Sequence, residues 1–360
     1  MTRRLLYLNG VAIMLVAVHH ASGYGFQAMF QWTDRYLDVT VPDYSLVGTL
    51  AFWIIVLIQQ LDNFALPGFM FVSGFFLAFM AKGQDTSVSW NTVFQRVRTL
   101  AIPFLFWTLA FFIIFQRRLP SNFDEMFDRY YYIVLLAQYY VFAPFVVPFA
   151  RKHWKLSLGL ALALEFIRFA VRYLDTVGAP LPGTSEFIAA TPHWLFPTLF
   201  FWFVLGIVAG FKRKEFAAWL ASARPYLIVA VSILAVSTLV EYWLISRTVE
   251  TGWLGPYFGG VSRFFYSLAF ILFFLSLDNA SLPFQRQFEQ LGTKSLGIYL
   301  VHARIMYVVA VFLYRVTPEV LGMQWLYQSI LIVTSLFGSL LLMEAVKRSP
   351  ARGYYRYLFG

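Results

Sequence analysis

Residues 5–25 read LLYLNGVAIMLVAVHHASGYG, an apolar run long enough to cross a membrane as one helix. The run follows two arginines and superficially resembles a secretion signal. It has no clear small-residue cleavage site, and it contains Asn9, His19 and His20 among its apolar residues. We therefore interpret it as a retained first transmembrane helix.

The composition of the whole chain supports a membrane protein. Of its 360 residues, 60% are hydrophobic and 13% are charged. A soluble domain carries about 25% charged residues, so this chain has too few charges to cover a water-facing surface. The composition excludes a soluble enzyme, a disordered chain and a nucleic-acid binder. Cysteine is absent, which excludes disulfides, thiolate nucleophiles and Cys-ligated metals.

Ten further apolar segments follow the first one, and the loops between them indicate orientation. The linkers 151–155 and 212–214 are strongly basic, whereas loops 174–193 and 248–258 contain no Lys or Arg. Positive residues favour the cytoplasmic side. The segment 47–62 is short and ends in polar residues, so we expect a re-entrant or broken helix there. The ten segments are 47–62, 64–81, 97–115, 131–150, 156–173, 193–211, 225–246, 259–277, 295–314 and 326–346.

If segment 47–62 does not cross the membrane, the Lys and Arg residues are distributed unequally between its two sides. Of the 28 Lys and Arg residues, 18 then fall on the cytoplasmic side, Lys82 among them, 9 fall on the outer side, and Arg304 lies within a span. We therefore predict an all-α, polytopic transmembrane helix bundle with about ten crossings and both termini in the cytoplasm. Residues 1–360 are expected to form a single integral-membrane domain in the inner (plasma) membrane.

Polar residues inside spans are costly and are therefore candidates for function. Asn9 and His20 are about three helical turns apart, so they share one face of the first helix. The neutral imidazole of His20 suits proton transfer near pH 7. Its alternative role is an interfacial histidine hydrogen-bonded to a neighbouring helix. His19 points about 100° away and is expected to be structural.

Two stretches in the first third of the chain allow a structural or a functional interpretation. Ser73 lies in an aromatic run, residues 71–76, where small residues favour close helix packing. Arg96 and Arg98 lie at the cytoplasmic end of a span. They either anchor the span as positive residues or bind phosphate through their planar guanidinium groups.

Two later stretches also allow either a structural or a functional interpretation. Glu165 and Arg168 are three residues apart on one face, where they either neutralise each other or line a site for a hydroxyl-rich or anionic acceptor. Ser295, Tyr299 and His302 share one helical stripe. That stripe is either a satisfied interhelical network or part of the site.

Taken in order, these segments resemble membrane-bound acyltransferase family 3, which includes bacterial O-acetyltransferases and glucan-modifying succinyltransferases. The likeness runs through most of the chain in five pieces. They are the first helix ending in His20, the run 71–76, the basic stretch before 102–107, the run 202–210 and the run 295–302. Asn9 departs from the family pattern, since many members carry arginine there, and Thr99 stands near the expected place of a second paired arginine.

The resemblance implies transfer of an acyl group, acetyl as first choice, from cytoplasmic acyl-CoA to a hydroxyl of an extracytoplasmic glycan or lipid-linked sugar. It implies His20 as catalytic general base and places Arg96 and Arg98 at the coenzyme A phosphates. An acyl-histidine relay is an alternative to direct attack. Membrane lipids are the remaining partners, and neither a metal nor nucleic acid is expected. Weaker candidates for substrate contact or for orienting His20 are Asn9, Ser73, Glu165, Arg168, Tyr299 and His302.

Two other classes of function fit the same polar residues. A transporter or flippase for a polar glycolipid would use buried Glu165, Arg168, His20 and His302 to line its path. It predicts substrate movement without dependence on acyl-CoA. A catalytically inactive scaffold is the other alternative, supported by Asn9 and Thr99 and opposed by the presence of His20.

Overall fold

The fold is described from a computed structural model that covers residues 2–81, 88–255, 260–277 and 281–360. Lys82 and the last residues of loop 248–258 lie outside this part of the chain. All regular elements in the described residues are helical, which confirms the predicted all-α class. The chain divides into two compact units, residues 1–65 with 224–352 and residues 66–223 with 353–360.

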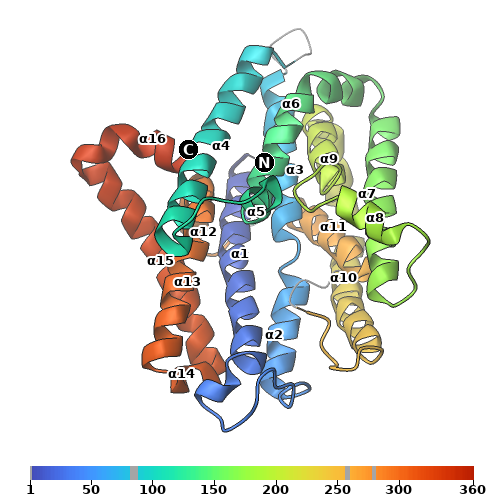
Figure 1. The fold of residues 1–360 in the computed structure, drawn as a ribbon. Helices are drawn as coiled ribbons and strands as arrows, with labels where there is room; N and C mark the ends of the chain where they lie inside the picture. The colour runs from blue at the N-terminus through green and yellow to red at the C-terminus, as the bar shows by residue number, and fades with distance from the viewer. Residues whose placement is uncertain (1, 82–87, 256–259, 278–280) are drawn as a thin grey trace. The chain divides into compact units, whose positions relative to one another are not determined.

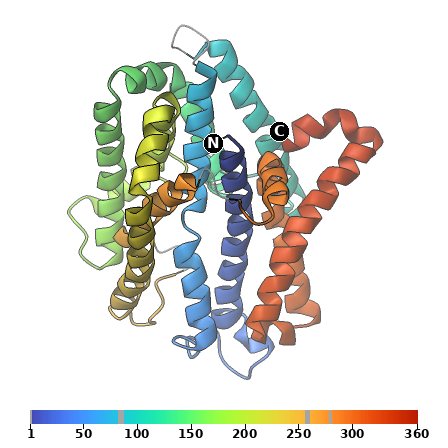
Figure 2. The same cartoon turned by 180° about the vertical axis from the view of Figure 1, so that it is seen from behind.

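The first unit is built around the N-terminal helix. In Figures 1 and 2, α1, α13 and α15 lie side by side, and α12 crosses α1. The short 3₁₀ helix Thr33–Arg35 and the first residues of another, Pro350–Tyr354, complete it. Its α-helices are α1 (Thr2–Phe30), α2 (Leu50–Leu61), most of α10 (Arg213–Ser246), α11 (Val261–Ser276), α12 (Gln285–Thr293), α13 (Ser295–Val316), α14 (Glu319–Gly322) and α15 (Gln324–Arg348).

The crossing of α1 and α12 depends on two glycines that let the backbones touch. A Cβ atom added to Gly10 would lie 1.9 Å from the carbonyl oxygen of Phe288. A Cβ on Gly292 would lie 2.0 Å from the carbonyl oxygen of Leu6. Small residues permit such close helix approach in membranes. This crossing sets the start of α13, the helix that carries His302.

The second unit contains the middle of the chain and its last residues. A π-helical turn, Phe112–Gln116, extends α4. The α-helices of this unit are α3 (Ala65–Ala81), α4 (Trp90–Phe111), α5 (Phe123–Asp128), α6 (Tyr131–Lys152), α7 (Trp154–Thr176), α8 (Thr184–Ala190), α9 (Phe200–Phe211), the start of α10, and α16 (Tyr355–Phe359).

A second glycine crossing joins α3 to α9. A Cβ on Gly74 would lie 2.0 Å from the carbonyl oxygen of Phe203, and one on Gly206 would lie 2.0 Å from that of Phe71. The close-packing interpretation of residues 71–76 is therefore correct for Gly74. Helix α9 begins at Phe200 rather than at the predicted 193, because Pro197 lacks an N–H group and disfavours helix in the residue before it.

Seven helical stretches are long and apolar enough to cross a membrane. One of them, Leu50–Ala81, joins α2 and α3 and is interrupted between Leu61 and Ala65. Predicted crossings 193–211 and 259–277 correspond to the shorter apolar helices α9 and α11, and α7 is not among the seven. The total of ten crossings and the cytoplasmic termini therefore stay predictions.

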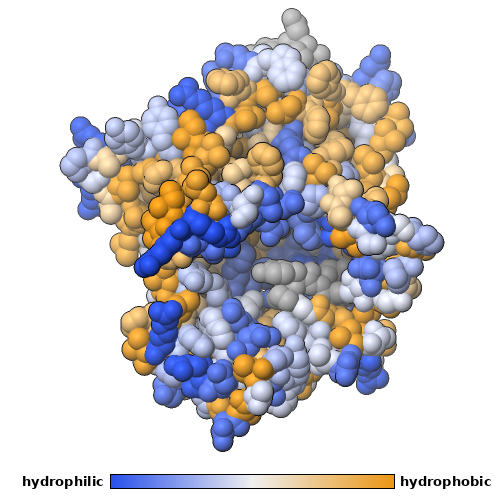
Figure 3. All heavy atoms as spheres, viewed as in Figure 1, coloured by the Kyte–Doolittle hydropathy of each residue, from blue (hydrophilic) through white to orange (hydrophobic). Residues whose placement is uncertain are grey.

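The exposed faces of the long helices are apolar. On α10, Val229, Ile233, Val236 and Val240 recur every three or four residues and are exposed. Figure 3 shows hydrophobic side chains gathered mainly on the upper half of the face in view. An apolar exterior of this kind suits lipid rather than water. The fold is therefore that of a polytopic helical membrane protein.

Candidate functional site

The candidate catalytic histidine faces a second histidine within the first unit. His20 comes from α1 and His302 from α13, and their ring centroids are 5.3 Å apart with the planes tilted by 46°. His302 is buried, whereas His20 is partly exposed. The structure thus brings together two sequence-predicted residues that are 282 positions apart in the chain. Tyr299 adjoins them, with its ring centroid 5.9 Å from that of His302.

The hydrogen bonds of His302 determine which of its nitrogens carries the proton. Its Nδ1 lies 2.9 Å from the carbonyl oxygens of both Ile298 and Tyr299. A carbonyl oxygen only accepts, so Nδ1 is the N–H donor, and in the neutral ring Nε2 carries the accepting lone pair. This buried Nε2 has no hydrogen-bond partner among the described residues. An unpaired buried acceptor is costly, so this atom is available to a donor from a substrate or from His20.

The neighbouring His19 has a different environment. Its Nδ1 lies 3.0 Å from Oδ1 and 3.1 Å from Oδ2 of Asp62, the residue that follows α2. Asp62 is buried. This contact ties α1 to the end of α2 within the first unit and agrees with the structural role expected for His19. In the sequence, Asp62 is only one of the polar residues that end segment 47–62.

Asn9 offers another unpaired acceptor on the same helix. Its Oδ1 is buried and has no hydrogen-bond partner among the described residues. Asn9 and His20 lie on one face of the continuous helix α1, about 16 Å apart along its axis. Because native proteins rarely leave buried polar atoms unpaired, Asn9 remains a candidate for substrate contact.

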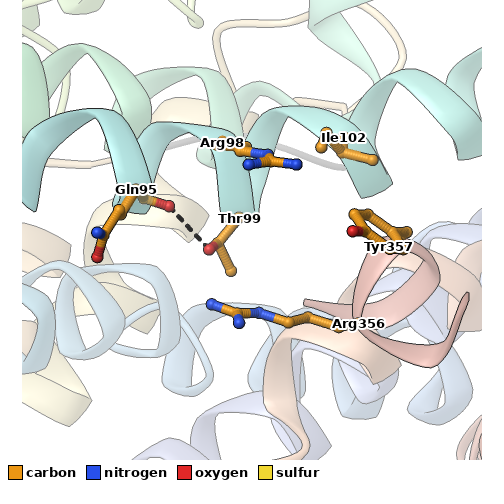
Figure 4. A pocket seen from close by; sticks show the side chains of 6 residues that line it. All are labelled: Gln95, Arg98, Thr99, Ile102, Arg356 and Tyr357. Atoms are coloured by element: carbon orange, nitrogen blue, oxygen red, sulfur yellow. Dashed lines mark hydrogen bonds between the residues drawn. The ribbon is translucent and has the colours of Figure 1, made fainter. Parts of the chain in front are cut away.

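In the second unit, Arg96 and Arg98 lie on different sides of α4. Residues two positions apart on a helix do not face each other. The Nη2 atom of Arg96 lies 2.9 Å from Sδ of Met80 on α3. Arg98 instead lines a cavity of about 330 Å³ together with residues of α16 (Figure 4). The structure therefore does not place the two arginines in one phosphate clamp.

Ser73 lies in a small polar network inside the second unit. Its hydroxyl lies near the phenol groups of Tyr132 and Tyr140 of α6. Tyr132 and Tyr140 are eight residues apart, about two turns, so they share a face of their helix. Ser73 therefore lies among polar side chains where α3 faces α6.

Glu165 serves as the cap of another helix. Its Oε2 accepts a hydrogen bond from the backbone N–H of Phe201 at 3.0 Å, and its Oε1 accepts one from Nε1 of Trp202 at 3.2 Å. Phe201 lies in the first turn of α9, whose N–H groups otherwise have no helical partner. Within the described residues no ion pair joins Glu165 to Arg168. Both carboxylate oxygens are therefore engaged inside the protein.

Arg168 and Arg172 hold the loop that leads into α9. Nη2 of Arg168 lies 3.2 Å from Nδ1 of His193, and Arg172 donates to the carbonyl oxygen of Thr191. Burial and the two nearby arginines lower the pKa of His193, so its ring is neutral and accepts from Arg168. A cavity of about 460 Å³ next to this loop is lined by His193, Arg172, Trp194 and the acidic residues of α5.

Three residues of these surroundings were missed from the sequence. Asp62 and His193 lie in short non-helical stretches, and Arg356 is one of the 18 residues predicted as cytoplasmic charges. For Arg356 a signal was present, because the aromatic residues around it, Tyr355, Tyr357 and Phe359, are unusual in a purely electrostatic tail. Among the described residues no group of three or more His, Asp or Glu side chains could hold a metal ion.

Comparison with known families agrees with this picture of a helical membrane protein. A family model described as an acyltransferase domain matches residues 5–344. The chain therefore belongs to acyltransferase family 3. No curated protein and no solved structure matches it.

Proposed function

We propose that this protein moves an acyl group, acetyl as first choice, from cytoplasmic acyl-CoA to a hydroxyl of an extracytoplasmic glycan or lipid-linked sugar in the inner membrane. Membership of an acyltransferase family supports the reaction type. The observation that carries the assignment of His20 is its position against His302, whose buried Nε2 lacks a partner. Two adjoining imidazoles, one partly exposed, suit the handling of a proton.

In the proposed reaction, His20 takes the proton of the acceptor hydroxyl as its oxygen attacks the thioester carbonyl. The C–S bond breaks when the tetrahedral intermediate collapses, and the thiolate of coenzyme A receives the proton from His20. The Nε2 lone pair of His302 accepts a hydrogen bond from the acceptor hydroxyl or from the protonated His20, and so holds the reacting groups in place.

The absence of cysteine offers a direct assay of this reaction. Free coenzyme A can be followed with a thiol reagent, and the protein itself contributes no thiol signal. We expect the purified protein to release coenzyme A from acetyl-CoA when envelope glycolipid is added. His20→Ala should lower that rate by about 10²–10⁴-fold, the usual contribution of a general base.

Two controls make this assay decisive. His153→Ala removes an exposed histidine between α6 and α7, and it should keep the full rate. A melting temperature of His20→Ala equal to that of the unchanged protein would show that the fold is retained. Undiminished release by folded His20→Ala would contradict its role as base, and glycolipid movement without coenzyme A release would favour a transporter.

A further inference from the structure

The cavity beside Arg98 is completed by the very end of the chain. Its lining residues on α4 are Gln95, Arg98, Thr99 and Ile102, and those on α16 are Arg356 and Tyr357. Figure 4 shows Arg98 and Arg356 reaching toward the space from the two helices, with Thr99 between them. The volume of about 330 Å³ is sufficient for a small phosphate-bearing group.

The C-terminal helix is fixed to α4 rather than attached loosely. Nε1 of Trp107 donates to the carbonyl oxygen of Leu358 at 2.7 Å. The ring of Phe359 is 3% exposed and lies 6.1 Å from that of Trp107. These contacts bring residues 353–360 into the second unit, although the preceding 129 residues belong to the first. Arg356 is therefore positioned by packing.

The charges of this cavity suit an anion. No carboxylate is among its lining residues. Within the described part of the chain, neither Arg98 nor Arg356 forms a hydrogen bond or an ion pair through its side chain. Each guanidinium presents several N–H donors in a plane and binds phosphate through two of them at once. Two such groups lining one small space are suited to binding a phosphate.

We propose that Arg356 is a cofactor-binding residue, which together with Arg98 holds the phosphates of coenzyme A. The inference rests on the proposed use of acyl-CoA as donor. Arg356 thus supplies, from the other end of the sequence, the second guanidinium that Arg96 does not bring to this cavity. Tyr357 is 44% exposed at its rim, where its ring is free to stack on the adenine.

The test compares a donor that has these phosphates with one that lacks them. Arg356→Ala should raise KM for acetyl-CoA about tenfold or more, because a charge-assisted hydrogen bond is lost. It should leave kcat/KM for acetyl-pantetheine unchanged, since that donor has no phosphate. Arg352→Ala is the matched control, because Arg352 is an exposed arginine four residues earlier that does not line the cavity.

A binding measurement separates failure of this site from failure of the proposed function. Adenosine 3′,5′-diphosphate should bind the unchanged protein and bind Arg356→Ala at least tenfold more weakly. If the diphosphate binds in this way but no acyl transfer is detected, the phosphate site would be supported and the proposed acyltransferase function overturned. Equal KM values for acetyl-CoA in a folded, active Arg356→Ala protein would overturn the site alone.

An anionic lipid headgroup carries the same phosphate chemistry and is tested in the same assay. The protein is placed in nanodiscs of phosphatidylcholine alone or with phosphatidylglycerol. The effect of Arg356→Ala on KM should be present in both. An effect that occurs only with phosphatidylglycerol would assign the site to lipid and overturn the assignment to coenzyme A.

Discussion

The imidazole of His20 faces that of His302 at 5.3 Å between ring centroids, whereas the adjacent His19 contacts the carboxylate of Asp62. Two consecutive histidines of one helix therefore have different surroundings. The difference follows from the helical turn of about 100° between them. We therefore expect His19 to stabilise the fold and His20 to take part in the reaction, and the two roles can be measured separately.

Asp62→Ala is expected to lower stability more than turnover. Removing a buried, charge-assisted hydrogen bond costs about 1–3 kcal/mol of unfolding free energy. The loss of coenzyme A release should be smaller than for His20→Ala. Tryptophan fluorescence melting and the thiol assay measure the two effects. A stable Asp62→Ala protein that has lost coenzyme A release would instead show that Asp62 takes part in the reaction.

His302→Ala is expected to lower kcat, because the unpaired Nε2 acceptor beside His20 is removed. Since His302 orients groups and is not the proposed base, the loss should be smaller than the loss of about 10²–10⁴-fold expected for a base. Steady-state kinetics with the thiol assay measure it. A kcat equal to that of the unchanged protein would show that the facing imidazole has no part in the reaction.

Gly10→Ala is expected to destabilise the protein by about 1–3 kcal/mol through overpacking against the backbone of α12. Gly23 lies on the same helix, and a Cβ added there would meet nothing within 4 Å. Gly23→Ala should therefore be neutral or stabilise by up to about 1 kcal/mol. Melting curves of the two variants in one detergent provide the comparison, and similar values for both would contradict the crossing.

Glu165→Ala is expected to lower the melting temperature because the first turn of α9 loses its cap. Glu165→Gln keeps one carbonyl oxygen that can accept a hydrogen bond. Its melting temperature should therefore lie between those of Glu165→Ala and the unchanged protein. Neither change should alter KM for the acceptor, because both carboxylate oxygens are used inside the protein. A raised acceptor KM in a stable Glu165→Gln protein would return Glu165 to the substrate site.

Stability should fall on acidification through His193. Its pKa is lowered in the folded protein, chiefly by burial and then by Arg172 and Arg168. Below its ordinary value of 6.5 the unfolded chain therefore takes up a proton that the folded protein resists. His193→Gln should flatten the fall in melting temperature below pH 6.5, whereas His153→Gln should not. Equal slopes for the two variants would contradict this role.

The sequence by itself determined the class of the fold and most candidate residues. Apolar runs of the right length and sparse charge can be accommodated only in a lipid-facing helical protein, since unpaired backbone groups are excluded from lipid. The spacing within α1 placed Asn9 and His20 on one face, because helical periodicity is a local property.

Only the tertiary structure decided which distant groups meet. His20 with His302, His19 with Asp62, and Arg98 with Arg356 are separated by 282, 43 and 258 positions. Helical periodicity specifies the face on which a side chain lies, but not which helix packs against that face. Close approach at Gly10, Gly292, Gly74 and Gly206 determines that packing. The same periodicity sets Arg96 and Arg98 apart, whereas Arg356 of the C-terminal helix α16 lines the same cavity as Arg98.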